Sequence, residues 1–290
     1  MLYWSKSYPE NRKSVGLNRL RKACQNYFMV FDEEGKHQPG KSYRERLMAL
    51  HNVHHGKRCF VMGNGPSLAR MNLSLLKEEI TIGSNGIFKK FSEIGFPTTY
   101  FTMEDTEQVE DREDELASIS GTTRFFALYN AHCIPARDDT LFLNIERTSH
   151  GEGHQGKRWK HLYPQFSLDL ASAVYLGATI TYINIQLAFF LGCDPIYLIG
   201  VDHNYGAITK KYKSGKIDID DKVMDELQNS HFISDYHSVG GRFGVPYTEQ
   251  QEMAYAHSYF VVKSFGRNIF NAGYDSHLEI FPKVSFDSLF

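Results

Sequence analysis

Short apolar runs recur through most of the sequence, and each ends in or beside a glycine, an asparagine or a carboxylate. The run at 59–62 leads directly into Gly-Asn-Gly-Pro, and the run at 195–201 is followed by an aspartate and a histidine. Apolar runs of about four to eight residues between turn residues are typical of strands buried on both faces of a sheet. The sequence therefore predicts a buried parallel sheet, with further strands at 80–83, 99–103, 125–129, 141–145 and 268–271.

The segments between these runs favour helices. Residues 179–191 form an apolar segment of helical length. Strands that alternate with helices indicate an α/β fold with a Rossmann-like, doubly wound and mostly parallel sheet. A length of 290 residues with 42% hydrophobic content is enough for one such domain and an appendage. We place the nucleotide-sugar-binding catalytic domain at 56–290.

Residues 1–55 have a different composition. They are rich in basic and aromatic residues and show no strand pattern, whereas Leu17, Leu20 and Ala23 follow helical spacing and 43–55 has the pattern of a second helix. We expect an N-terminal helical appendage packed on the main domain. The alternative is a basic face that makes peripheral contact with a membrane or a partner.

Charge and hydropathy narrow the class of protein. The formal net charge is −2, so the chain lacks the overall positive charge that is typical of proteins that bind nucleic acids. No apolar run approaches the roughly 20 residues needed to span a bilayer, and the first residues lack the apolar core of a signal peptide. The four cysteines stand singly, which favours reduced thiols over a disulfide frame or a zinc site. We expect a cytoplasmic protein, placed at the inner face of the membrane if the basic segment binds there.

The loop after the first predicted strand is Gly63-Asn64-Gly65-Pro66-Ser67. It is not a Walker A loop, because no Gly-Lys-Ser/Thr follows, and it lacks the third glycine of the dinucleotide fingerprint. Two glycines still allow a ligand close to the backbone, and a following helix would offer N–H groups to a phosphate. A larger residue at Gly65 should then weaken nucleotide binding more than stability. The alternative is a simple strand-to-helix turn.

Polar residues stand at the ends of four predicted strands. In an open parallel sheet, ligands bind beyond the carboxyl ends of the strands, so these residues are expected to form one site. Any one of them could instead cap a helix. The residues are Asn64, Asn85, Glu104 with Asp105, and Asp202 with His203.

Candidate metal ligands are incomplete. His51, His54 and His55 lie at helical spacing, but no nearby carboxylate or cysteine completes a site. Asp218 and Asp220 match a D-x-D pattern, but they lie in the lysine-rich segment 210–222, which we expect to be a solvated surface loop, either an insertion or a flexible lid. The sequence therefore predicts no metal site.

Several ordered motifs resemble the DUF115 (MptE-like) family of bacterial and archaeal proteins. The resemblance extends from 56 to 290 and, more distantly, to the family-42 bacterial sialyltransferases, which share the Gly-Asn-Gly-Pro-Ser loop. The motifs lie at 56–60, 63–68, 80–86, 104–105, 177–182, 197–203, 230–232 and 268–282.

This resemblance implies an inverting, metal-independent glycosyltransferase that moves a sialic-acid-like keto-sugar from CMP to a glycan or lipid-linked glycan acceptor. It implies that the 63–67 loop and Asn85 hold the nucleotide, and that Thr179, with Thr181 in the same motif, lies near the donor. It implies that His231 is the general base. Tyr205 and Tyr212 are approximate counterparts of the tyrosines that steady the leaving phosphate.

Two other functions stay open. Transfer of pyrophosphate from ATP to a hydroxymethylpterin is also known in this superfamily, and it would need magnesium held by Glu104, Asp105 or Asp202. A binding module would keep the pocket without chemistry. If His231 is not the base, His203 and His237 are the neighbouring candidates. A homo-oligomer is compatible with the sequence.

Overall fold

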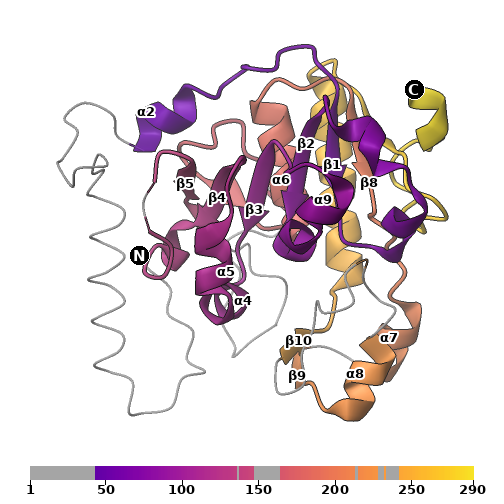
Figure 1. The fold of residues 1–290 in the computed structure, drawn as a ribbon. Coiled ribbons are helices and arrows are strands. Elements are labelled where there is room, and N and C mark those ends of the chain that lie inside the picture. Colours follow the sequence, from indigo (N-terminus) through magenta and orange to yellow (C-terminus); the bar gives the residue numbers. More distant parts are fainter. Residues whose placement is uncertain (1–42, 136, 147–163, 213–214, 228–231, 233–241) are drawn as a thin grey trace.

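The structure is a computed structural model that describes residues 43–135, 137–146, 164–212, 215–227, 232 and 242–290. Its centre is a seven-stranded sheet in the order β11-β8-β1-β2-β3-β4-β5, and every neighbouring pair in it is parallel. Figure 1 shows the sheet with helices packed around it. The strands are β1 (Cys59–Met62), β2 (Ile80–Ser84), β3 (Tyr100–Met103), β4 (Thr123–Ala127), β5 (Thr140–Leu143), β8 (Ile196–Ile199) and β11 (Ile269–Asn271).

The helices follow the strands in alternation, as an α/β fold requires. The short connections are η2 (Pro66–Arg70), η3 (Leu73–Leu76), η4 (Asn85–Lys90), α3 (Phe91–Ile94), α4 (Thr106–Asp111), α5 (Glu113–Ser118) and η5 (Leu128–Asn130). The longer helices are α6 (Ile180–Phe190) and α9 (Thr248–Ser264), and η6 (Phe286–Leu289) lies near the end of the chain. The predicted Rossmann-like class is confirmed, and all seven predicted strands are present with boundaries shifted by at most two residues.

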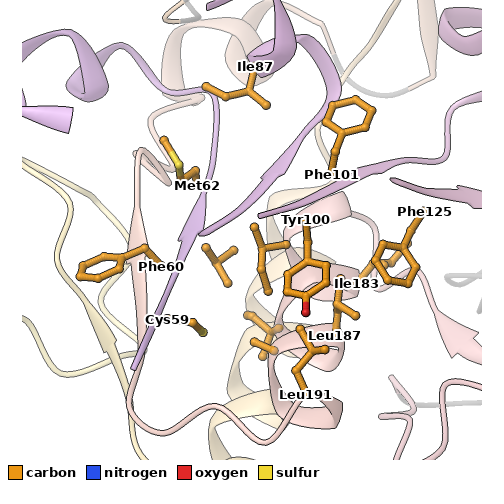
Figure 2. Close-up of a cluster of buried hydrophobic side chains, with 14 of the residues drawn as sticks. Cys59, Phe60, Met62, Ile87, Tyr100, Phe101, Phe125, Ile183, Leu187 and Leu191 are labelled. Atoms are coloured by element: carbon orange, nitrogen blue, oxygen red, sulfur yellow. The ribbon is translucent and has the colours of Figure 1, made fainter. Parts of the chain in front are cut away.

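Helix α6 is the centre of the core. It packs against β1, β2 and β3 and against α9, and every residue from Thr181 to Phe190 is buried. Ile183, Leu187 and Leu191 are spaced four residues apart, so they share one face that points at the sheet. Figure 2 shows these side chains beside Tyr100 and Cys59. A helix that is apolar all round belongs inside the protein, as its sequence predicted.

Helix α6 runs antiparallel to the strands. In its first turns, Asn184 Oδ1 accepts a hydrogen bond of 2.5 Å from Thr102 Oγ1, one residue before the end of β3. At its other end, Leu191 O accepts from His54 N–H, which precedes β1. The first turn of α6 therefore lies at the carboxyl edge of the sheet, where the polar strand ends also lie.

The segment before β1 packs on the main domain. Helix α2 (Tyr43–Met48) is followed by turns rather than by the helix that was predicted to reach 55. Asn52 N–H and His54 N–H donate to the carbonyls of Phe190 and Leu191, and these bonds take the place of further helical turns. The expected helix around Leu17, Leu20 and Ala23 lies outside the described residues. No helix in the described part of the chain is long and apolar enough to cross a bilayer.

A small lobe extends from one end of the sheet (Figure 1). It contains α7 (Gly206–Lys211), β9 (Lys216–Asp218), α8 (Asp221–Leu227) and β10 (Arg242–Gly244), with β9 and β10 antiparallel. It has its own apolar cluster of Ile219, Val223, Leu227, Phe243 and Val245. The predicted insertion at 210–222 lies in this lobe, and most of its described residues are exposed, as expected. It is more regular than a loop, because Ile219 and its apolar neighbours form a small core. A further short pair, β6 (Ile145–Glu146) and β7 (Val174–Tyr175), lies beside β5.

Candidate functional site

The site begins at the point where the sheet reverses its strand order. From β1, the chain builds β2 to β5 on one side, and then returns to place β8 and β11 on the other side. Ligands of open α/β sheets bind beyond the carboxyl ends of the strands at such a switch point. Here that point lies between β1 and β8, so the loops after these two strands are the first candidates for a ligand site.

The loops after β1 and β8 are bonded tightly to each other. Gly63 N–H donates to Ile199 O and Gly65 N–H donates to Gly200 O, each at 2.8 Å. Ser67 N–H donates to Asp202 Oδ2 at 2.9 Å, and the Ser67 hydroxyl donates to Asp202 Oδ1. Asp202, which was predicted to bind the donor, therefore anchors the glycine loop.

The close contact between the two loops explains why positions 63 and 65 are both glycine. A Cβ on Gly63 would lie 2.2 Å from Gly200 O, and a Cβ on Gly65 would lie 2.4 Å from Asp202 Cγ. The φ of Gly65 is −67°, so Gly65 is required by space and not by backbone conformation. Neither atom that would clash is the flexible end of a long side chain, so a larger residue forces the two loops apart.

The loop does not offer its N–H groups to a phosphate in the way the sequence suggested. The N–H groups of Gly65 and Ser67 already have partners, and Pro66 has no N–H. The helix behind the loop is η2, a five-residue 3₁₀ helix, rather than a full α-helix. Gly200 O and Asp202 therefore occupy the N–H groups of Gly65 and Ser67, and the role of the loop in binding a nucleotide stays a prediction.

Asn64 and the end of β2 provide free polar atoms instead. Asn64 Nδ2 donates to Ser84 O at 3.0 Å, and Asn64 O accepts from Phe232 N–H at 2.7 Å. Asn64 Oδ1 and Ser84 Oγ are buried and have no hydrogen-bond partner among the described residues. Asn85 follows with a φ of +52°, a left-handed conformation that asparagine tolerates better than most residues. Unpaired buried polar atoms at a strand end mark a place for a ligand or water.

The carboxylates after β3 have partners within the protein. Asp105 Oδ1 accepts from the N–H groups of Glu107 and Gln108, so Asp105 caps α4. The Tyr129 hydroxyl donates to Glu104 Oε2. The helix-cap alternative is therefore correct for Asp105.

Thr179 and Thr181 lie at the first turn of α6. The Thr179 side chain accepts from Thr181 N–H and so caps the helix. Both threonine side chains also hydrogen-bond to the Tyr255 hydroxyl, and burial raises the pKa of Tyr255. Gln251 Nε2 donates to Ala178 O at 3.2 Å. Helix α9 thus fixes the start of α6 at the carboxyl edge of the sheet.

His203 follows the anchoring aspartate and has a partner on α9. Its Nε2 lies 3.0 Å from Glu252 Oε1, and its side chain is only 5% exposed. Its Nδ1 is buried and has no hydrogen-bond partner among the described residues. The rings of Tyr205 and Tyr255 lie edge-on to it at centroid distances of 5.7 and 6.1 Å. Sequence reasoning found His203 but missed Glu252, because only the packing of α9 brings the two together.

With this geometry established, the comparisons with known proteins identify the family. The family model described as 6-hydroxymethylpterin diphosphokinase MptE-like matches residues 40–207, which is more than half of the chain. The chain belongs to this MptE-like family. The match includes the glycine loop, the strand ends after β2, β3 and β8, and the start of α6. It ends at residue 207, in the first turn of α7, so it leaves out most of the small lobe and all of α9.

A solved structure has a similar outline at low identity. It is the MAf glycosyltransferase from Magnetospirillum magneticum AMB-1, with 13% identity and a TM-score of 0.47. The comparison covers 86% of this MptE-like chain and 38% of the other chain, so this chain spans well under half of that protein's length. No curated protein matches this chain.

Of the remaining predicted site residues, the structure describes Tyr212 but not His231. Tyr212 lies in the small lobe, where its hydroxyl donates to Glu226 Oε2 at 3.2 Å and its ring packs against the lobe's apolar cluster. His231 and His237 lie outside the described residues. Phe232 is described, and its ring lies 5.4 Å from Lys90 Nζ.

The candidate metal ligands have other partners. His54 Nε2 bonds to the Tyr100 hydroxyl at 2.7 Å, on the amino side of the sheet. Asp220 Oδ1 accepts from Val223 N–H in the first turn of α8. Among the described residues, no three histidine, cysteine, aspartate or glutamate side chains are grouped so that they could hold a metal.

Proposed function

We propose that this MptE-like chain is a transferase that binds a nucleotide-activated donor at the β1–β8 switch point. The specific reaction we propose is transfer of a sialic-acid-like keto-sugar from CMP to a glycan or lipid-linked glycan acceptor. The observation that carries the proposal is the locked glycine loop with unpaired polar atoms beside it. Asn64 Oδ1 and Ser84 Oγ lack partners at the place where the fold puts ligands.

The proposed donor has cytidine and a phosphate for these groups to recognise. Asparagine and serine side chains supply the few well-placed hydrogen bonds that orient a ligand in a mostly apolar site. The resemblance to the sialyltransferases, through the loop at 63–67 and Asn85, is what selects CMP among nucleotides. Thr179 and Thr181 stand at the start of α6 on the same edge of the sheet.

The chemistry of the proposed reaction is inverting displacement. The bond between the anomeric carbon and the phosphate oxygen breaks, and its electron pair stays on the phosphate. The acceptor oxygen forms the new bond to carbon, and its proton passes to a base. The resemblance assigns that base to His231, and this assignment remains a prediction. A base contributes about 10²- to 10⁴-fold to the rate of such a step.

The second candidate is diphosphate transfer, which the name of the matched family favours. It would require a divalent cation held by carboxylates, as nucleoside triphosphate enzymes do. Both oxygens of Asp202 and Oδ1 of Asp105 accept from N–H or hydroxyl groups of the protein, and Glu104 accepts from Tyr129. These carboxylates have structural partners, while the uncommitted groups are an amide and a hydroxyl. We therefore rank glycosyl transfer first.

A thermal-shift panel tests the choice between the two. CMP, CDP, UDP, GDP and ATP are each added with and without magnesium. A ligand at 100 times its Kd stabilises the folded state by about 2.7 kcal/mol, which raises the Tm by roughly 5–10 °C for a chain of this size. We expect CMP or CDP to give the largest rise, without a need for magnesium. A preference for ATP with magnesium would select diphosphate transfer, and no shift with any nucleotide would refute both functions.

A turnover assay separates an enzyme from a binding module. CMP-activated sialic acid is incubated with the protein, and released CMP is measured with and without a chelator. Release that survives chelation supports the proposed metal-independent transfer. Tight CMP binding with no release, with or without an added glycan acceptor, would leave only a binding function.

A further inference from the structure

A phosphate bound at the β1–β8 switch point would be repelled by the negative charge of a nearby carboxylate. Asp202 places a carboxylate against the glycine loop, and like charges in a site of low dielectric repel strongly. The N–H groups of Gly65 and Ser67 are taken by partners within the protein, so they cannot offset this repulsion. A donor that can carry positive charge at this edge would offset it.

His203 is the residue that meets this need. It directly follows Asp202, so it stands at the carboxyl end of β8 beside the loop. Its φ of +52° lies in the left-handed region, which is uncommon for residues other than glycine, and its side chain is only 5% exposed. Its neighbours there are Tyr205, Tyr255 and Glu252.

Glu252 fixes the orientation of the ring. With Nε2 3.0 Å from Oε1 of Glu252, the ring donates its Nε2 proton to a carboxylate. This bond fixes the position of Nδ1. A phosphate oxygen beside Nδ1 favours the ring form in which both nitrogens carry a proton, so His203 can donate to it while Nε2 keeps its bond to Glu252.

The unpaired Nδ1 is the second observation. Leaving a buried polar group without a partner costs about 1–3 kcal/mol, so such groups are few in folded proteins. Nδ1 of His203 is buried and has no partner among the described residues. A ligand oxygen in that position would remove the cost. The Tyr205 ring packs edge-on against the imidazole, so a ligand that reaches Nδ1 must bind beside this ring or displace it.

We propose that His203, oriented by Glu252, binds the phosphate of the nucleotide donor and stabilises it as it leaves. This inference rests on the proposed function, in which the donor is a nucleoside monophosphate ester. When the bond from carbon to the phosphate oxygen breaks, the electron pair stays on the phosphate. The hydrogen bond from Nδ1 strengthens as that charge develops. His203 is a catalytic residue in this scheme, and Glu252 is a positioning residue.

The test compares CMP with cytidine, which differ only in the phosphate. The affinity of each ligand is measured by calorimetry for the full chain and for His203→Ala and Glu252→Gln. A charge-assisted hydrogen bond is worth roughly tenfold or more in affinity. We expect His203→Ala to lower the ratio of CMP affinity to cytidine affinity by about that factor, with cytidine affinity unchanged within a few-fold. Glu252→Gln should lower the same ratio by a smaller factor.

Two further variants keep the test decisive. Glu249→Gln lies one turn away on α9, is exposed, and should leave the ratio unchanged. His203→Asn tolerates the positive φ and offers an uncharged amide N–H near the position of Nδ1, so it should retain part of the ratio even if the alanine variant fails to fold.

The results distinguish this inference from the proposed function. If the wild-type protein binds CMP and no His203 or Glu252 variant changes the ratio, the role of His203 is wrong and the donor assignment stands. If the wild-type protein prefers ATP, the donor assignment is wrong, and the ratio of ATP to adenosine then tests His203. If the protein binds no nucleotide, both proposals are refuted.

Discussion

Replacing Gly65 with alanine tests the contact that locks the two loops. The new Cβ would lie 2.4 Å from Asp202 Cγ, whereas ordinary van der Waals contact begins at 3.4 Å. Asp202 must then retreat by roughly 1 Å. That movement would stretch the Ser67 N···Asp202 Oδ2 distance of 2.9 Å beyond the range of a hydrogen bond. The bond from the Ser67 hydroxyl to the same carboxylate would break with it.

The magnitude follows from these two bonds. A hydrogen bond to a charged group contributes about 1.5–3 kcal/mol, and water can replace part of it because Asp202 is only half-buried. We expect Gly65→Ala to lower the free energy of unfolding by about 3 kcal/mol. The sequence alone predicted that a larger residue here would affect nucleotide binding more than stability. The structure predicts that both fall together.

Urea denaturation followed by circular dichroism measures this loss. Gly244→Ala is the matched control, because no atom lies within 4 Å of the position of its Cβ, and it should change stability by less than about 0.5 kcal/mol. Asp202→Ala removes the group that would clash, so adding Gly65→Ala to it should cost little more. If Gly65→Ala costs as much in the Asp202→Ala background as in the wild type, the explanation through Asp202 is wrong.

Three other substitutions and one titration test the remaining structure by the same denaturation assay. Asp139→Ala leaves the fully buried Arg124 without its ion pair and should lower the free energy of unfolding by about 3–5 kcal/mol. Adding Arg124→Met should recover part of that loss, and no recovery would contradict this account. Gly177→Ala places a Cβ 2.3 Å from the Tyr182 ring at a φ of +57° and should cost at least about 2 kcal/mol, so a neutral result would argue against the packing of α6. Thr179→Ala removes the cap of α6 and should cost about 1 kcal/mol, while Thr179→Ser should retain most of the cap. Burial lowers the pKa of His54, which Lys57 lowers further, and burial also lowers the pKa of His257, so the folded chain takes up their protons less readily than the unfolded chain. The free energy of unfolding should therefore be constant above about pH 6.5 and fall as the pH drops below it. His257→Gln should reduce that fall. If the free energy of unfolding depends on pH as steeply in the variant as in the wild type, His257 is excluded as a cause.

The fold was largely predictable because a short apolar run with a polar residue or glycine at its end marks each strand of the sheet. The limits of that reasoning are local. The fourth strand was expected at 125–129 and lies at Thr123–Ala127, because Leu128 and Tyr129 continue into a 3₁₀ turn. An apolar run does not show where extended backbone becomes a turn. At 210–222 the lysines suggested solvent, but Ile219 and its neighbours build a small core that depends on β10, about 25 residues further along.

The site was predictable in position and not in detail. The sequence predicted that Asn64, Asn85 and Asp202 lie at one edge of the sheet, because each follows a predicted strand and the carboxyl ends of parallel strands share one edge. The partner of each side chain depends on strand order, which no local pattern contains. Only the adjacency of β1 and β8 reveals that Asp202 anchors Ser67, and only the packing of α9 places Glu252 on His203.

The pairing of β1 with β8 also has a consequence for how the chain folds during synthesis. Ser67 and Asp202 are 135 residues apart, so the glycine loop cannot be locked until β8 has left the ribosome. At about 5–20 residues per second, that delay is roughly 7–27 seconds. During this time β1, whose four residues are all buried in the finished protein, presents one unpaired edge. A truncation before β8 leaves that edge open permanently and should aggregate rather than fold.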